Sequence, residues 1–196
     1  QKQGTICGLR ILPGLKEAIP LTSDNTESIA FGNGSAIEIG MTHRGGTLQV
    51  LHLSEFGPIA AESPERARKI VTGAFGTVHA GQAIHVESTA AGTGGEFHDM
   101  VMKAEARAKD KRPLSELDFK LHFFAWMRER GYRLNPNAVL ITSELVEYFE
   151  ELEKAHKIKL DPAQRAWYAA KRNQIGPDDM LREYPSTAEE AFKSSI

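Results

Sequence analysis

Two short apolar segments with a helical pattern between them constrain the fold of this chain more than any other feature. "LQVLHL" (48–53) and "AIHVES" (83–88) each predict a β-strand. Between them, Ser63 is a candidate helix cap and Pro64 suits the first helical position. A strand, a helix and a second strand form the repeating unit of a parallel sheet. We therefore expect an α/β fold with a parallel sheet flanked by helices.

The rest of the chain predicts a hairpin before these strands and mainly helices after them. "SIAF" (28–31), the turn "GNGS" and "AIEIG" (36–40) predict a β-hairpin, because Asn and Gly accept positive φ at low cost. "KLHFFAW" (120–126) predicts one more strand, and we place a boundary near residue 130, beyond which the chain is helical and charged. Apolar spacing and capping signals predict helices at 63–75, at about 96–109, around 145–152, from Asp161 to near Gly176, and from Thr187.

Composition limits the classes of function. With 196 residues the chain fits one sizeable domain, or a domain with a small appendage. A net charge of -2 indicates no overall basic field, so any contact with nucleic acid must come from a local patch. The single cysteine, Cys7, excludes an internal disulfide and suits a reducing cytosol, and no apolar run approaches the roughly 20 residues that span a bilayer. Because the chain opens on Gln1, we expect it to be an internal piece of a longer protein.

Polar side chains follow both predicted strands of the parallel sheet. Ser54 and Glu55 end the first strand, ahead of a predicted turn at Gly57-Pro58, and Glu87-Ser88-Thr89 ends the second. The carboxyl ends of parallel strands meet at one edge, where open α/β sheets bind ligands. An acidic residue at that edge polarises the attacking water in phosphoryl transfer. The alternative is a solvated rim carboxylate beside hydroxyls that merely begin a turn.

Basic residues near these strands could contact phosphates. Arg44 precedes the first strand and could reach a nucleotide phosphate, or it is a solvated loop cation. Arg66, Arg68 and Lys69 lie on the helix after that strand, where they could hold DNA phosphates or form an ordinary solvated face. The glycine-rich "AGTGG" (91–95) lacks the Lys-Ser/Thr of a phosphate-binding loop, so we interpret it as a flexible turn.

Several segments, in this order, resemble the large terminase subunit of tailed bacteriophages, the motor that pumps DNA into the empty capsid. The ordered set of segments is more specific to this family than any single segment, and "SEFG", "ESTA" and "YPSTAEEAF" contribute most to it. The segments are "IAFGNGSAIEIG" (29–40), "RGGTLQVLHLSEFG" (44–57), "IHVESTAAGTGGEFHDM" (84–100), "HFFAWM" (122–127) and "REYPSTAEEAF" (182–192).

The resemblance implies a P-loop NTPase-like fold and specific roles for the strand-end residues. Residues 1–130 would be the second half of an ATPase core, and residues 131–196 a helical lid or linker leading toward a nuclease domain. Glu55 would be the catalytic carboxylate of the Walker B segment, and Ser88-Thr89-Ala90 the coupling motif that links hydrolysis to DNA movement. Ser54 stands where the commoner pattern has Asp, so it would hold Mg²⁺ through a water molecule.

The resemblance also implies cofactors, partners and a cellular place. ATP and Mg²⁺ would be the cofactors. The partners would be double-stranded DNA, the portal protein and the terminase small subunit. The protein would act in the host bacterial cytoplasm, as a homo-oligomeric ring on the procapsid, and its full-length form would also cleave concatemeric DNA.

Two motifs of that family are missing from the sequence, and their absence leaves other functions open. No GxxxxGK[ST] segment occurs, and no Asp-rich nuclease follows Phe192. We therefore expect the chain to be inactive as an ATPase by itself. The alternatives are a non-catalytic α/β interaction module that docks on a portal or partner subunit, and a helicase-like DNA translocase without a nuclease.

Overall fold

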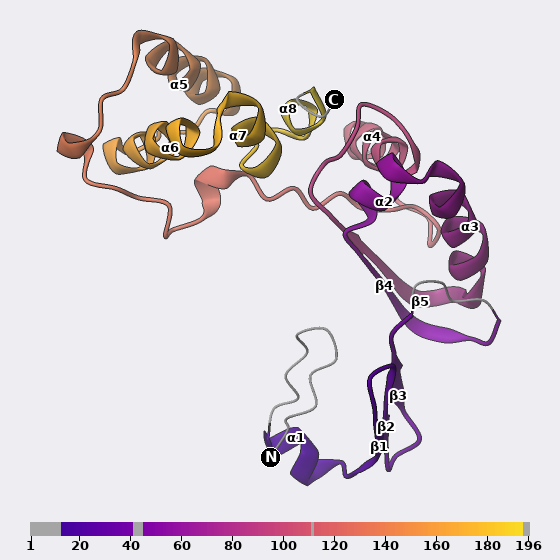
Figure 1. The fold of residues 1–196 in the computed structure, drawn as a ribbon. Coiled ribbons are helices and arrows are strands. Elements are labelled where there is room, and N and C mark those ends of the chain that lie inside the picture. Colours follow the sequence, from indigo (N-terminus) through magenta and orange to yellow (C-terminus); the bar gives the residue numbers. More distant parts are fainter. Residues whose placement is uncertain (1–12, 41–44, 111, 194–196) are drawn as a thin grey trace. The chain divides into compact units, whose positions relative to one another are not determined.

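The computed structural model describes residues 13–40, 45–110 and 112–193 (Figure 1). The chain divides into two compact units, residues 1–45 and residues 46–196. Among the described residues, no helix is both long enough and apolar enough to cross a membrane.

The first unit contains a small antiparallel sheet. Its elements are α1 (Pro13–Ala18), β1 (Leu21–Asp24), β2 (Ser28–Phe31) and β3 (Ala36–Glu38), with the strands in the order β1-β2-β3. The predicted hairpin is confirmed as β2 and β3. Gly34 adopts a φ of 85° in its turn, a conformation that glycine reaches without strain. Ile29 and Phe31 of β2 form the buried core of this unit.

Strand β1 was missed because its sequence does not alternate between apolar and polar residues. The connection from β1 to β2 nevertheless has a local signal. The side-chain Oδ1 of Asn25 accepts hydrogen bonds from the backbone N–H groups of Glu27 and Ser28, each at 2.9 Å. Asn side chains commonly form such turns, so "DNTES" is the connection between two antiparallel strands.

The second unit begins with a parallel pair of strands, β4 (Leu48–Ser54) and β5 (Val78–Glu87). Figure 1 shows α2 (Phe56–Glu62), α3 (Pro64–Ala74) and α4 (Glu96–Lys109) gathered on one side of this pair. The short 3₁₀ helix η1 (Phe75–Thr77) leads from α3 into β5. The mixed α/β class and the parallel pairing that we predicted are therefore confirmed for these residues.

Alternation along β4 explains why one face of the sheet carries the helices. Leu51 and Leu53 turn toward the core, whereas Val50, at 59 % exposure, lies on the opposite face. The predicted helices at 63–75 and 96–109 are also confirmed, and Ala67 and Ile70 of α3 lie in the same core as Leu51. Burial of these apolar side chains is the main stabilisation of the parallel pair.

Two local predictions were wrong, and a third was confirmed only in part. Gly57-Pro58 does not form a turn between two elements but lies in the first turn of α2. Proline is tolerated there because a backbone N–H in the first helical turn has no partner within the helix, so its absence costs no hydrogen bond. Ser63 precedes α3 as predicted, but its side chain makes no capping hydrogen bond; its backbone N–H closes α2 on the carbonyl of Ile59. "KLHFFAW" is not a strand. Leu121 and Phe123 do turn inward and pack against the core that contains Leu51, but their segment pairs with no strand among the described residues.

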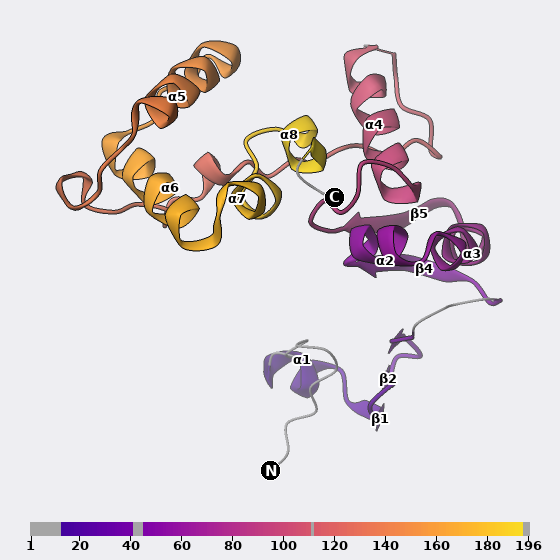
Figure 2. The same ribbon diagram turned by 45° about the horizontal axis from the view of Figure 1, so that its top comes forward.

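The remainder of the second unit is helical. Figure 2 shows α5 (Ser143–His156), α6 (Pro162–Ile175) and α7 (Pro177–Glu183), with α6 next to both others. The 3₁₀ helices η2 (Trp126–Arg128) and η3 (Pro136–Ala138) precede them, and α8 (Ala188–Lys193) follows. Trp126, Phe149, Tyr168 and Met180 belong to their common core.

The start of α6 and of α8 follows the capping signals in the sequence. At α6, Asp161 and Gln164 form a complete capping box, with the backbone N–H of Gln164 donating to Asp161 Oδ1 at 2.8 Å. At α8, Thr187 Oγ1 accepts from the backbone N–H of Glu190 at 3.0 Å. Short α7 was missed, because Gly176 was taken as the end of the helical segment.

Helix α8 does not join the helical core with its apolar side chains. Ala188, Ala191 and Phe192 belong instead to the core of the β4–β5 part, where the Phe192 ring lies 6.1 Å from that of Phe97. The two cores of the second unit therefore meet at α8. The boundary near residue 130, and the roles of ATPase core and lid on its two sides, stay predictions.

Candidate functional site

The parallel pairing brings the two strand ends together at one edge. Ser54 is the register partner of Glu87. The Ser54 hydroxyl donates to Glu87 Oε1 at 2.6 Å, and His52 Nε2 lies 3.5 Å from the same oxygen. We predicted that both polar clusters leave neighbouring parallel strands at the same edge, and this prediction is confirmed.

Glu55 stands at the corner between β4 and α2 in a left-handed conformation, with φ 54° and ψ 41°. A non-glycine residue in this region carries strain of about 1–3 kcal/mol, and such residues are concentrated at functional sites. The Glu55 side chain is exposed and makes no cap hydrogen bond to α2. Glu55 therefore stands exposed at the end of β4, and its role stays a prediction.

Gly57 and Ser88 tie the two strand ends to each other. The backbone N–H of Gly57 donates to Ser88 Oγ at 2.9 Å. A Cβ atom on Gly57 would lie 2.4 Å from the carbonyl oxygen of Thr89 and 2.8 Å from Ser88 Oγ. Only glycine fits at this point, so the glycine of "SEFG" serves the close approach of the segment that follows Glu87.

The three residues of the predicted coupling motif have different surroundings. Ser88 is half-buried and holds the first turn of α2, whereas the side chain of Thr89 is exposed. Ala90 is buried in the core beside the sheet. After Ala90 the chain passes through Gly92 and Gly95, both at positive φ, into α4. This segment therefore connects the strand edge to the first turn of α4.

The donor set at the edge fits a hard cation only in part. The Ser54 hydroxyl and the carboxylates of Glu55 and Glu87 are the oxygen ligands that Mg²⁺ prefers. Within the described part of the chain there is no group of three or more His, Cys, Asp or Glu side chains arranged for a metal ion. A nucleotide-bound Mg²⁺ takes most of its ligands from phosphate and water, so one or two protein oxygens are the expected contribution.

The structure describes three of the four basic residues that we predicted to contact phosphates or DNA. Arg44 lies outside the described residues. Arg68 and Lys69 are exposed on α3, and Arg66 is half-buried on the same helix, while Ala67 faces the core. Their contact with DNA stays a prediction.

Sequence reasoning missed Glu87 as a member of this site. It was recognised only as the residue before the hydroxyl pair, because its importance depends on which residue of β4 lies opposite. The register fixes Ser54 as that residue, with a shift in pairing between Leu48 and Val50. On β5 the irregularity lies between Val78 and Ala83 and includes Gly81 at a φ of 83°, so a glycine in the strand pattern was the one signal that could have indicated it.

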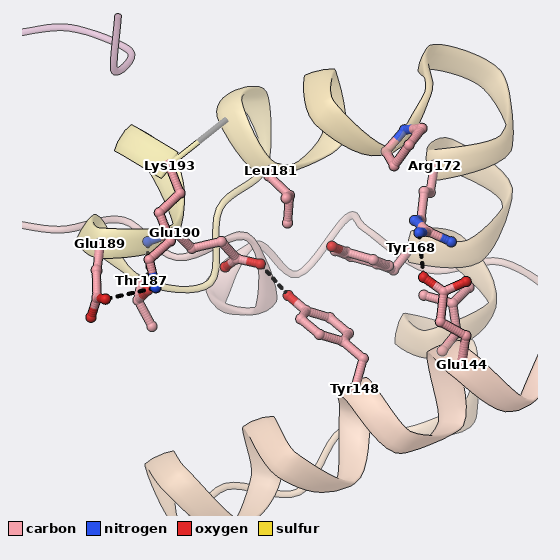
Figure 3. Close-up of a pocket in the computed structure, with 11 residues that line it drawn as sticks. Glu144, Tyr148, Tyr168, Arg172, Leu181, Thr187, Glu189, Glu190 and Lys193 are labelled. Atoms are coloured by element: carbon pink, nitrogen blue, oxygen red, sulfur yellow. Dashed lines mark hydrogen bonds and ion pairs between the residues drawn. The ribbon is translucent and has the colours of Figure 1, made fainter. Parts of the chain in front are cut away.

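Two cavities lie in the helical part and not at the strand edge. The first has a volume of about 360 Å³. Figure 3 shows that Tyr148 of α5 points to Glu190 of α8 at this cavity, and that Arg172 pairs with Glu144. The second, of about 430 Å³, is lined by aromatic rings, among them that of Trp167.

The polar groups at the first cavity form a closed network. The hydroxyl of Tyr148 donates to Glu190 Oε1 at 2.8 Å and lies 2.6 Å from Ser186 Oγ, which also accepts from Trp126 Nε1 at 3.0 Å. Burial raises the pKa of Tyr148 well above its ordinary value and that of Tyr168 to about 12. Both phenols therefore stay neutral at physiological pH and act in this network as hydroxyl donors and acceptors.

Comparison with protein-family models, with curated proteins and with solved structures found no significant match. A functional assignment therefore depends on the geometry of the strand edge and on the order of the motifs in the chain.

Proposed function

We propose that this chain is part of an ATP-driven motor that packages double-stranded viral DNA into procapsids, namely the large subunit of a terminase. The observation that carries the proposal is the shared edge of β4 and β5. There, Glu55 and the Ser88-Thr89 pair leave neighbouring parallel strands and are joined through Gly57. The order of the terminase-like segments along the chain supports it.

In this proposal the α/β part belongs to a P-loop NTPase-like core that uses ATP and Mg²⁺. Glu55 orients the attacking water, because its carboxylate is exposed and held at the corner by a strained backbone. Ser54 accepts a hydrogen bond from a metal-bound water, and Arg44 contacts a phosphate. The bound Mg²⁺ would neutralise charge on the phosphates during transfer.

The same geometry supports a coupling role for Ser88, Thr89 and Ala90. A movement of the Glu55 backbone would displace the first turn of α2. The backbone N–H of Gly57 in that turn donates a hydrogen bond to Ser88. The segment that follows contains Gly92 and Gly95, whose lack of side chains offers little steric resistance to rearrangement, and it leads into α4. Phe97 of α4 contacts Phe192 of α8, which offers a route from the strand edge to the helical subdomain.

The partners of the motor belong to the same proposal. Double-stranded DNA would be held in part by Arg66, Arg68 and Lys69 on α3. The portal protein and the terminase small subunit would complete a homo-oligomeric ring on the procapsid in the host bacterial cytoplasm. The complete protein would carry a nuclease domain that cuts concatemeric DNA.

The direct test is Glu55→Gln in the complete product of the open reading frame that encodes this chain. The substitution keeps the shape of the side chain and removes its charge, so we expect ATP hydrolysis to fall by about 100-fold or more while ATP binding survives. Glu62→Gln, at the exposed end of α2, is the matched control. Turnover of the Glu55→Gln variant within a few-fold of the parent would contradict the role of this carboxylate.

A second test addresses coupling. Thr89→Val preserves the size of the exposed side chain and removes its hydroxyl, so DNA packaging should fall more than ATP hydrolysis does. Both rates are measured in the same packaging reaction with purified procapsids. Equal losses in hydrolysis and packaging would count against a coupling role.

One observation favours a non-catalytic interaction module as the second candidate: the cavities described above lie in the helical part, away from the strand edge. Such a module would bind a portal or partner subunit equally well with or without Glu55→Gln, and its complete gene product would hydrolyse no ATP. A helicase-like translocase would hydrolyse ATP and move on DNA without cleaving it.

A further inference from the structure

We infer that Glu87 is a positioning residue of the strand-edge site, which fixes the Ser54 hydroxyl and supplies the negative charge that a serine lacks. The inference rests on the proposed function, because it concerns the cation of that same site. It begins from a contact that the sequence alone did not indicate. Ser54 Oγ and Glu87 Oε1 lie 2.6 Å apart across the parallel pair.

The contact fixes the direction of the Ser54 hydroxyl. A serine has one O–H donor and two acceptor lone pairs, and its hydroxyl rotates unless a partner holds it. Here the proton is committed to the Glu87 carboxylate in a short, charge-assisted hydrogen bond. The lone pairs of Ser54 Oγ are left to accept from a water molecule at the exposed edge.

The contact also places a negative charge next to Ser54. The Glu87 side chain is 55 % exposed, and His52 Nε2 approaches the same Oε1 atom from the neighbouring position on the face. A neutral hydroxyl attracts a hydrated divalent cation only weakly, whereas a carboxylate in contact with it makes the oxygen a stronger acceptor. Partners that orient a metal-binding group in this way commonly change affinity by about 10- to 100-fold.

The pair of residues thus distributes over two strands what an aspartate at position 54 would do alone. The carboxyl ends of β4 and β5 lie opposite each other, so the charge can come from either strand. Moving the carboxylate from residue 87 to residue 54 should therefore preserve binding of the cation.

The test compares four variants of the complete gene product: Glu87→Gln, Glu87→Ala, Ser54→Asp and the double variant Ser54→Asp/Glu87→Gln. The readout is binding of Mn²⁺, followed by the loss of its free electron-paramagnetic-resonance signal in the presence of a non-hydrolysable ATP analogue. ATP hydrolysis and thermal unfolding are measured on the same samples. Glu62→Gln serves again as the control for loss of an exposed carboxylate.

We expect Glu87→Gln to weaken Mn²⁺ binding by about tenfold, and Glu87→Ala at least as much, because the alanine removes both charge and hydrogen bond. Ser54→Asp alone places two carboxylates in contact and should lower the unfolding temperature. The double variant should return Mn²⁺ binding to within a few-fold of the parent. A purely structural contact would not give this recovery of metal binding.

The outcomes separate this inference from the proposed function. If Glu55→Gln abolishes hydrolysis but Glu87→Gln and Glu87→Ala leave Mn²⁺ binding unchanged, the inference is overturned and the proposed function stands. If both Glu87 variants weaken binding but the double variant does not recover it, charge supply by Glu87 is overturned. If the parent protein neither binds the ATP analogue nor hydrolyses ATP, both proposals fail.

Discussion

The segment that follows β5 leaves no room for a side chain at Gly57. The Cα of Gly57 lies so close to this segment that a methyl group would enter the space of the Thr89 carbonyl. That neighbour is backbone and cannot rotate away. The contact holds α2 against the end of the sheet.

Gly57→Ala should therefore destabilise the protein by about 1–3 kcal/mol, the usual cost of forcing extra volume into a packed site. Urea unfolding of the 196-residue chain measures this change. Gly76→Ala is the matched control, because a Cβ at Gly76 meets nothing within 4 Å. Similar losses for both variants would show that the close approach to Thr89 is not what Gly57 provides.

Asp118 is held by several donors in the loop after α4. Arg107 Nη2 donates to Asp118 Oδ2 at 3.0 Å, and the backbone N–H and hydroxyl of Ser115 donate to the same oxygen. The guanidinium of Arg107, together with Ser115, lowers the pKa of Asp118 well below its ordinary value of 3.8. The contribution of this carboxylate to stability is therefore present above pH 3.8 and is lost as the pH falls through its lowered pKa.

Asp118→Asn should accordingly lower the unfolding temperature at pH 7, and the difference from the parent should shrink as the pH is reduced below about 4. Thermal unfolding between pH 2 and pH 7, followed by circular dichroism, checks this. Glu116→Gln removes an exposed neighbouring charge and is the control. A difference that stays constant across this range would exclude the lowered pKa as its source.

At the scale of the element, α8 interacts with both cores of the second unit. It is short and carries a charged face, yet Phe192 meets Phe97 and lies 5.0 Å from the ring of His98. Glu190 of the same helix accepts a hydrogen bond from the hydroxyl of Tyr148. The helix thus contributes to one core by apolar contact and to the other by hydrogen bonds.

Phe192→Ala should lower the free energy of unfolding by about 3 kcal/mol, because it leaves a cavity beside Phe97. Phe124→Ala is the control, since that ring is 82 % exposed. Chemical denaturation of both variants gives the comparison. A loss no greater than that of Phe124→Ala would mean that α8 does not contribute materially to the first core.

The elements also show what the sequence could predict. Capping at Asp161 and Thr187, and the apolar spacing of α3 and α5, determine local conformation and were predicted correctly. The expected strand at 120–126 failed, because alternation specifies which side chains turn inward but not whether a strand partner is present. Glu87 was missed for a related reason: the pairing that places it opposite Ser54 is a property of two distant segments.

At the scale of the whole molecule, the second unit contains both larger cores, and the first unit has its own small core around Ile29. Residues 46–196 should therefore fold without residues 1–45. We expect their unfolding temperature to lie within about 3 °C of that in the full chain, which corresponds to less than about 1 kcal/mol.

Differential scanning calorimetry of the 46–196 segment and of the full chain makes this comparison. A reduction of about 10 °C or more would show that the first unit stabilises the second. The same segment retains Ser54, Glu55 and Glu87, so it also allows the strand-edge contacts to be studied with the first unit removed.

The contact between Phe97 and Phe192 has a consequence for the order of events during biosynthesis. A ribosome releases β4, α2, α3, β5 and α4 long before it releases α8, so a nascent chain exposes an unfilled apolar surface on α4 while the helical part is still being made. The α/β part acquires its last core residues only when translation has passed residue 192, and until then the exposed apolar surface favours aggregation of the nascent chain.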